Sequence, residues 1–289
     1  MNNVCVGCFM GKRLTQIDAL GTEEQATRMG KKILQMYAES PPDMDSALLG
    51  GLVDAEICRF YGIDPDRFKE EKEMSNRFVM ERLDVIRSRV EQAEDPIYAG
   101  LQYAVLGNYL DFSALAGQVS FEDLEKMLDK AKDIDLDRQV YGDFCADLQK
   151  GGKLLYITDN AGEIGFDRVL AEQIGKKYPG VAITFMVRGG IISNDATRED
   201  AQAVGITLPV IDSGVAIGGT AISRCSEDAQ VAIRDAEVIL AKGMGNTESM
   251  YGCGYNVYYA FLVKCDRFVQ YFNKPKMTPM FIRDKEFGK

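Results

Sequence analysis

The sequence contains no histidine, and this absence excludes several kinds of active site. Among its 289 residues the His count is 0, so a Ser-His-Asp triad, a histidine general base and a histidine-ligated zinc ion are all impossible. Any acid–base chemistry must therefore use Asp, Glu, Lys, Tyr, Cys or water bound to a metal ion.

Long hydrophobic runs and a secretory leader are also missing. The apolar runs are too short to span a bilayer. The first residues, Met1-Asn2-Asn3-Val4-Cys5, have neither a basic start nor an apolar core. We therefore expect a cytoplasmic protein with no membrane partner. The 7 cysteines are an odd number, which argues against a disulfide scaffold in such a chain.

Basic residues are few relative to acidic ones. There are 34 Lys and Arg against 44 Asp and Glu, which gives a formal net charge of −10. Nucleic acids and anionic membranes need clustered Lys and Arg, so neither is expected as a partner. An anionic small molecule is not excluded, because one local basic pocket is enough to bind it. The sequence does not define the oligomeric state.

Two regions with different patterns make up the chain. We expect a helical domain over residues 1–115 and a Rossmann-like three-layer α/β/α domain over residues 116–289. In the second region, apolar strand-like runs alternate with helical patterns, which predicts a mostly parallel sheet. The predicted strands are 153–158, 181–187, 207–211, 237–241 and 266–271, and the predicted helices are 163–176, 197–203, 226–235 and 255–263.

Helix-start signals divide the first region. Thr22-Glu23-Glu24-Gln25 is a capping box for a helix that continues to about Glu39. Asp43 or Asp45 is expected to cap the next helix, which ends near Tyr61. Two Asp-Pro pairs predict further starts, with Pro at the first helical position. They are Asp64-Pro65 and Asp95-Pro96, and later helices are expected from Ser120 and from Asp135.

Polar side chains follow two neighbouring predicted strands. Asp159 and Asn160 come directly after Lys153-Leu154-Leu155-Tyr156-Ile157, and Ser193-Asn194-Asp195 follows the strand at 181–187. In open α/β sheets, ligands bind beyond the carboxyl ends of the strands. Two carboxylates and an amide oxygen there suit Mg²⁺ or Mn²⁺ together with a phosphate. A plainer alternative is that Asp159 and Asp195 only cap the helices that follow.

Glycine-rich polar loops follow four of the strands. Glycine allows the backbone to approach a phosphate and to present N–H groups to it. Each loop alone is weak evidence, but all four at one end of a sheet would form a pocket. The loops are Asp159-Asn160-Ala161-Gly162-Glu163, Arg188-Gly189-Gly190, Ser213-Gly214-Val215 and Lys242-Gly243-Met244-Gly245-Asn246.

This combination resembles the damage-control phosphatases, the domain of unknown function 89 family, over almost the whole chain. Cys5-Val6-Gly7-Cys8 resembles the amino-terminal Cys pair of the prokaryotic branch. The other matching segments are Gly107-Asn108-Tyr109-Leu110-Asp111-Phe112, Thr158-Asp159-Asn160-Ala161-Gly162-Glu163, Arg188-Gly189-Gly190, Asn194-Asp195-Ala196-Thr197, Ala241-Lys242-Gly243-Met244-Gly245-Asn246 and Lys264-Cys265.

The resemblance implies metal-dependent hydrolysis of phosphomonoesters, such as sugar phosphates or damaged phosphometabolites. It implies that Asp159, Asn160 and Asp195 bind the metal ion. The cofactor is then a divalent metal, Mg²⁺, Mn²⁺, Co²⁺ or Ni²⁺, and the partner is a small-molecule phosphate ester. It also implies a helical amino-terminal region on a Rossmann-like domain.

Three further side chains are candidates for catalysis or phosphate binding. Lys242 would pair with a phosphate oxygen and offset transition-state charge, or it is a plain surface lysine. Arg188 would bind the same phosphate in a forked manner, or it pairs with a structural carboxylate. Glu163 would orient the attacking water, or it favours the helix dipole in the first turn.

The remaining candidates concern substrate binding. Gly189, Gly243 and Asn246 are expected to contact substrate from the glycine-rich loops. Asn108 and Asp111 are expected to reach the site from the helical region, which would then wall one side of the pocket. A polar link between domains, or a helical region that only covers the sheet, explains these two residues equally well.

The nucleophile remains open between metal-activated water and Asp159 itself. We favour metal-activated water, because the second Asp of haloacid dehalogenase phosphatases is replaced by Ala161. Two other functions stay possible: an S-adenosylmethionine-dependent methyltransferase, and a non-catalytic regulator that binds metal or phosphometabolites. Cys5 and Cys8 have the spacing of zinc or redox sites, but no second Cys-x-x-Cys accompanies them, and we expect a non-catalytic role.

Overall fold

A six-stranded sheet forms the centre of the computed structural model, which describes residues 3–41, 44, 46–110 and 121–285. The strands are β1 (Gly152–Ile157), β2 (Val181–Val187), β3 (Val210–Asp212), β4 (Val238–Lys242), β5 (Val257–Leu262) and β6 (Pro279–Arg283). Their order is β3-β2-β1-β4-β5-β6, and all neighbours are parallel except β5 and β6. The order reverses between β1 and β4, so a ligand crevice is expected beyond these two strands.

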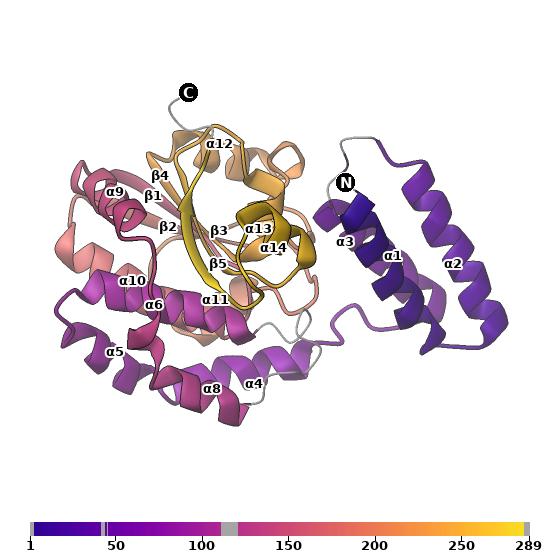
Figure 1. The fold of residues 1–289 in the computed structure, drawn as a ribbon, viewed down its shortest axis with the longest axis horizontal. Helices are drawn as coiled ribbons and strands as arrows, with labels where there is room; N and C mark the ends of the chain where they lie inside the picture. The colour runs from indigo at the N-terminus through magenta and orange to yellow at the C-terminus, as the bar shows by residue number, and fades with distance from the viewer. Residues whose placement is uncertain (1–2, 42–43, 45, 111–120, 286–289) are drawn as a thin grey trace.

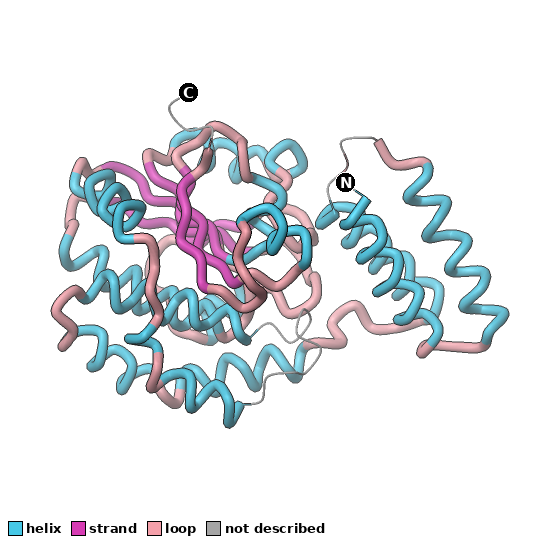
Figure 2. The backbone as a smooth tube through the Cα atoms, viewed as in Figure 1, coloured by secondary structure: helices cyan, strands magenta, loops and turns pink. Residues whose placement is uncertain are grey.

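Helices cover both faces of this sheet, which is the predicted mixed α/β architecture (Figure 2). Side chains alternate along each strand: Leu154 and Tyr156 of β1 face one layer, whereas Leu155 and Ile157 face the other. The first layer holds α6 (Pro96–Gly107), α9 (Arg138–Gln149) and α10 (Glu163–Lys177). The second holds α12 (Glu227–Asp235), α13 (Gly243–Met250) and α14 (Asp266–Phe272).

The first three helices form a lobe of their own, seen apart from the sheet in Figure 1. They are α1 (Asn3–Asp18), α2 (Glu23–Ala38) and α3 (Ser46–Tyr61). Residues such as Ile17, Met29 and Val53 are buried between them. The predicted capping box is present at Thr22. Asp43 and Asp45, the predicted caps of α3, lie outside the described residues.

Further helices lie around α6 and α10. They are α4 (Lys69–Met80), α5 (Leu83–Glu91), α8 (Phe121–Leu128), α11 (Arg198–Ala203) and the short 3₁₀ turns Asn108–Leu110 and Ala131–Asp133. A third 3₁₀ turn, Ile222–Arg224, packs on the second layer. Among the helices that the structure describes, none combines the length and apolar character that crossing a bilayer requires.

Three sequence predictions are wrong in the last third of the chain. The predicted helix 255–263 is strand β5, and the predicted strand 266–271 is helix α14. Every residue of β5 is buried, so its apolar pattern has no period that distinguishes a strand from a helix. The glycine-rich loop after β4 is helix α13, which begins at Gly243.

Of the two Asp-Pro pairs predicted to start helices, Asp95-Pro96 does so and Asp64-Pro65 does not. Asp95 caps α6 through the Tyr98 N–H, with Pro96 in the first turn. Asp64 instead accepts a hydrogen bond from the Asp66 N–H in a turn, and α4 begins only at Lys69. The same dipeptide therefore starts a helix at one position and a turn at the other.

A buried charged cluster joins β4 to the helices of the first layer. Lys242 at the end of β4 is fully buried, on the same face of the strand as Val238 and Leu240. Its ammonium group donates to Glu163 Oε1 at 2.6 Å, to Asp167 Oδ1 at 2.8 Å and to the Ala104 carbonyl at 2.7 Å. These three bonds use all the donors of a lysine.

Two carboxylates, those of Glu163 and Asp167, share this one ammonium group. Burial, the largest influence, raises the pKa of Asp167 to about 6, although Lys242 acts in the opposite direction. Burial acts to lower the pKa of Lys242, but Asp167 and Glu163 together raise it. Within the part of the chain that the structure describes, Asp167 Oδ2 is buried without a hydrogen-bond partner.

We expect the substitution Lys242→Met to lower the free energy of unfolding by about 3–5 kcal/mol, because it leaves buried carboxylates without a counter-charge. Urea unfolding followed by circular dichroism measures this. Lys153→Met is the matched control, since Lys153 on β1 has a side chain 61% exposed and should change stability by less than about 0.5 kcal/mol. Equal effects of the two substitutions would contradict the assigned role of the cluster.

Asp167 should also make stability depend on pH. Its folded-state pKa of about 6 lies above the ordinary value of 3.8, so its contribution is largest below pH 4 and is lost as the pH rises through 6. The stability of the wild type relative to Asp167→Asn should therefore fall by about 2 kcal/mol between pH 4.5 and 7.5. Urea unfolding of both proteins between pH 4.5 and 7.5 tests it. A constant difference would show that Asp167 does not titrate in this range.

Candidate functional site

A cavity of about 860 Å³ lies between the amino-terminal lobe and the carboxyl ends of the strands. Its size is within the usual range for small-molecule sites. Residues from both parts of the chain line it. They include Phe9, Lys12, Arg13 and Gln16 of α1, Ser46, Gly50 and Asp54 of α3, Arg67 and Phe68 before α4, and Asp159, Asn160, Asp195, Gly218, Gly245 and Lys264 around the strand ends.

Backbone pairing brings the two predicted oxygen clusters together. Asn160 and Asp195 form an isolated β-bridge. The Ala196 N–H donates to the Asp159 carbonyl at 2.7 Å, and the Ala161 N–H donates to the Asn194 carbonyl at 2.9 Å. The loops after β1 and β2 are thus joined directly, and Asp159, Asn160 and Asp195 all line the cavity.

Arg188 lies beneath these carboxylates and contacts both. Its Nε donates to Asp195 Oδ2 at 2.6 Å, and its Nη2 lies 3.5 Å from Asp159 Oδ1. Its Nη1 donates to Asn246 Oδ1 at 2.9 Å. Only 1% of the Arg188 side chain is exposed. Arg188 therefore pairs with two carboxylates of the candidate site itself, and its contact with a phosphate stays a prediction.

Glu163 and Asn108 hold Asn160 in a fixed orientation. Asn160 Nδ2 donates to Glu163 Oε2 at 2.8 Å and to Asp159 Oδ2 at 2.9 Å. Asn108 Nδ2 donates to the same two oxygens, at 3.0 Å each. Both amide hydrogens of Asn160 are thus occupied. Among the described residues, none donates a hydrogen bond to its side-chain oxygen Oδ1, whereas its backbone carbonyl accepts from the Ile164 N–H.

Glu163 is a buried positioning residue in this arrangement. Its side chain is fully buried, with one oxygen on Lys242 and the other on Asn108 and Asn160. It also lies in the first turn of α10, as the helix-dipole interpretation requires. A direct contact with attacking water, the other predicted role, does not fit a side chain with both oxygens occupied.

The side chain of Lys242 points away from the cavity in which a phosphate was predicted to contact it. The expected strand ended at Ala241, but β4 continues through Lys242, and strand alternation then directs the side chain toward α6 and α10. The ammonium group is saturated there and does not line the cavity.

Three predicted substrate-binding residues lie behind the cavity wall and support the loops that form it. The Gly189 N–H donates to Ser213 Oγ and to the Val215 carbonyl. Gly243 has φ +78, and a Cβ there would overlap the Asp159 carboxylate. Asn246 is buried and donates to the Thr158 and Lys242 carbonyls. None of the three lines the cavity.

The helical region does contribute to the site. Asn108 reaches Asp159, but it is fully buried and does not line the cavity, so its contact with substrate stays a prediction. Asp111 lies outside the described residues. The basic side chains on the lobe side, Lys12, Arg13 and Arg67, were missed by sequence reasoning. They carry no motif, and 41 residues separate Arg13 from its partner Asp54, so no local signal was available.

The residues present fit a divalent cation. No group of three or more Asp, Glu or Cys side chains in the described chain is arranged to hold a metal, so the candidate depends on the amide oxygen as well. Asp159, Asn160 and Asp195 supply hard oxygen atoms, which Mg²⁺ and Mn²⁺ prefer. The oriented carbonyl oxygen of Asn160 supports this assignment most directly.

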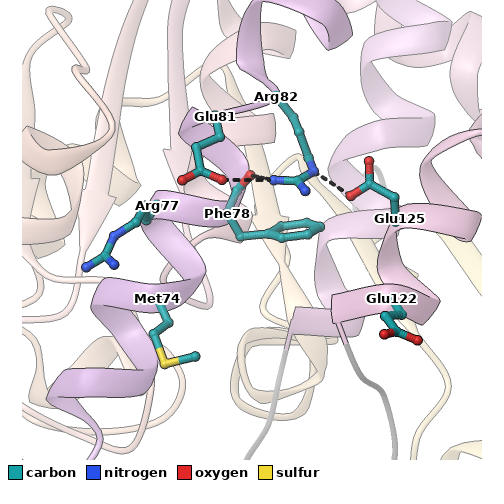
Figure 3. Close-up of a pocket in the computed structure, with 7 residues that line it drawn as sticks. All are labelled: Met74, Arg77, Phe78, Glu81, Arg82, Glu122 and Glu125. Atoms are coloured by element: carbon teal, nitrogen blue, oxygen red, sulfur yellow. Dashed lines mark hydrogen bonds and ion pairs between the residues drawn. The ribbon is translucent and has the colours of Figure 1, made fainter.

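A second cavity, of about 490 Å³, lies between α4 and α8 (Figure 3). Its walls carry Arg82, which donates to Glu125 at 2.6 Å and stacks over the Phe78 ring. Arg82 therefore already pairs with Glu81 and Glu125, two of the carboxylates that line this cavity. It lacks the combination of carboxylates and an amide found at the strand ends, and we do not assign it a function.

The cysteines do not form a disulfide scaffold. All seven lie in the described residues, where each is a free thiol. Cys5 of α1 accepts a hydrogen bond from Arg267 of α14 at 3.4 Å. Zinc binding by Cys5 and Cys8 stays untested.

Comparisons with known proteins identify the family of this chain. The family model of the damage-control phosphatase ARMT1-like domain matches residues 1–278. A damage-control phosphatase of Pyrococcus horikoshii is 28% identical over 288 residues, 97% of either chain. An uncharacterized protein of Methanocaldococcus jannaschii is 36% identical over 220 residues, 74% of this chain and 68% of its own. The crystal structure of a DUF89 family protein from Pyrococcus horikoshii superposes with a TM-score of 0.83 at 25% identity and covers 99% of each chain. The resemblance inferred from the motifs is confirmed, and the chain belongs to the damage-control phosphatase ARMT1-like family.

Proposed function

We propose that this protein is a divalent-metal-dependent phosphatase that hydrolyses phosphomonoesters of small metabolites in the cytoplasm. The observation that carries the proposal is the set of Asp159, Asn160 and Asp195 at one end of the cavity. Its relatives in Pyrococcus horikoshii and Archaeoglobus fulgidus are named damage-control phosphatases, which supports the same reaction class.

In this proposal, Asp159, Asn160 and Asp195 hold the metal ion. When bound, the ion would neutralise charge on the phosphoryl group and make water a better nucleophile near neutral pH. The protein's part is to keep the three donors in place. Arg188 fixes Asp195 and Asp159 from below, and Glu163 with Asn108 fixes the Asn160 amide.

Preorganised charge is what such a reaction needs from the protein. Phosphoryl transfer depends mainly on positioning and electrostatic stabilisation. Buried groups that are already hydrogen-bonded do not have to reorganise during the reaction. Lys242 then acts through Glu163 as a positioning residue. Phosphate binding falls to the metal ion and to cavity groups such as Lys264, which is half-buried and also donates to the Asn108 carbonyl.

The two alternative functions, methyltransferase and regulator, each make different demands on this site. A methyltransferase would not require the second oxygen cluster at Asp195. A regulator would bind metal and phosphometabolite without releasing phosphate. Family membership together with the joined oxygen clusters favours hydrolysis over both.

We expect Asp159→Ala and Asp195→Ala each to weaken Mn²⁺ binding at least tenfold, because each removes a hard oxygen ligand. Titration calorimetry measures the affinity, and circular dichroism checks the fold. Glu248→Gln is the matched control, since Glu248 lines the same cavity but is not a proposed ligand. Unchanged Mn²⁺ affinity in both Asp variants would refute the assigned ligands.

We also expect phosphate release to depend on added metal. The purified protein should hydrolyse some members of a sugar phosphate and nucleotide panel with Mg²⁺, Mn²⁺, Co²⁺ or Ni²⁺, and EDTA should abolish the activity. Asp159→Ala should lower turnover by about two orders of magnitude or more, as loss of one preorganised electrostatic group does elsewhere. Binding of panel members without phosphate release would favour the regulator, and S-adenosylmethionine binding would favour the methyltransferase.

A further inference from the structure

A pair of arginines lies in the cavity on the lobe side, opposite the oxygen cluster. Arg13 is on α1, and Arg67 is in the segment between α3 and α4. Both guanidinium groups donate to the same atom, Asp54 Oδ1, at 3.2 Å and 2.7 Å respectively. All three residues line the cavity that Asp159 and Asp195 also line.

The two guanidinium groups are held firmly, yet they keep donors to spare. Arg13 also donates to Gln16 and to the Gly50 carbonyl, and Arg67 to the Cys58 sulfur. A guanidinium has five N–H donors. Within the described chain, three of these are used by Arg13 and two by Arg67.

Aromatic rings further restrict the two side chains. The Arg13 guanidinium lies 5.9 Å from the centre of the Phe9 ring, and that of Arg67 lies 4.8 Å from the Phe68 ring. Both rings line the cavity. Such stacking fixes the plane of a guanidinium and thereby lowers the entropy cost of binding a ligand.

The charges of Arg13, Arg67 and Asp54 do not balance. Two arginines face one carboxylate, and burial, followed by the influence of Asp54, raises the pKa of the Cys58 thiol, which is therefore neutral. Lys12 adds a further positive charge to the same wall. The arginine side chains are 22% and 25% exposed, so they are shielded from bulk water but accessible from the cavity.

We propose that Arg13 and Arg67 form a subsite for a second anionic group, so that the substrates are phosphate esters that also carry a carboxylate or another phosphate. The inference rests on the proposed function, which places the scissile phosphate at Asp159, Asn160 and Asp195. Forked guanidinium groups suit either anion. In this proposal the carboxylates of Asp159 and Asp195 bind the metal ion, which binds the scissile phosphate. The guanidinium groups of Arg13 and Arg67 bind the second anionic group of the same substrate, because both sets of residues line one cavity.

Two matched pairs of compounds test the subsite. 3-Phosphoglycerate differs from glycerol 3-phosphate by a carboxylate, and fructose 1,6-bisphosphate differs from fructose 1-phosphate by a phosphate. In at least one pair, the wild type with Mg²⁺ should bind the compound with the second anion about tenfold to hundredfold more tightly, as expected for charged hydrogen bonds. Calorimetry gives the dissociation constants, and kcat/KM should show the same preference.

The variants Arg13→Gln and Arg67→Gln, made separately so that Asp54 keeps one partner, should each bring this ratio close to one. Affinity for the compound with one anion should stay within about twofold. Arg59→Gln is the control, since Arg59 lies on α3 with a side chain 72% exposed and pairs with Glu56. It should leave the ratio unchanged.

The outcomes separate this inference from the proposed function. If neither these four compounds nor any member of the sugar phosphate and nucleotide panel releases phosphate, the phosphatase assignment fails, and the binding ratios still decide the subsite. No preference in either pair, no binding of any of the four compounds, or a preference that both arginine variants retain would overturn the subsite.

Discussion

The ion pair between the buried ammonium of Lys242 and Glu163 is the interaction on which the candidate site most depends. A buried charge is tolerated only when it is paired and hydrogen-bonded. Lys242 therefore fixes the first turn of α10 against the end of β4. Glu163 Oε2 then orients Asn160 and Asn108, and both amides reach Asp159. The sheet thus positions the oxygen donors through a chain of short bonds that starts in its interior.

Much of this site could be predicted because strand ends are readable from sequence. The residues that follow a buried parallel strand must emerge at its carboxyl edge, and neighbouring strands share that edge. Asp159 and Asp195 meet for this reason, and the bridge between Asn160 and Asp195 completes the contact. The oxygen cluster therefore follows from element order alone.

The role of Lys242 could not be predicted in the same way, because it depends on whether strand β4 ends at Ala241 or one residue later. A strand that ends at Ala241 leaves the next side chain free to point along the strand axis, toward a ligand. A strand that includes Lys242 places it on the face of Val238 and Leu240. Strand boundaries are the least certain part of sequence reasoning.

The errors near the carboxyl end have a different cause. Strand β5 is buried on both faces, so it lacks the alternation that identifies a half-exposed strand. Helix α14 carries Phe268, Tyr271 and Phe272, and aromatic residues are enriched in strands. In both segments local composition favoured the wrong element, and packing around the sheet determined the structure. The Arg13–Asp54–Arg67 contact was equally hidden, since only the packing of the lobe brings these residues together.

Substitutions in the buried cluster of Lys242 and at the arginine pair of the cavity should have different effects, and this difference separates a structural role from a role in substrate recognition. A change at Lys242 removes the counter-charge of Glu163, so fold stability and metal affinity should decrease together with turnover. Reduced turnover alone would therefore be no evidence that Lys242 touches the phosphate. A change at Arg13 is remote from that cluster and leaves Asp54 paired with Arg67. Its effect should appear in the choice of substrate while stability and metal binding are retained. Measuring these three properties on one set of variants assigns each residue to the scaffold, the metal site or the recognition of substrate.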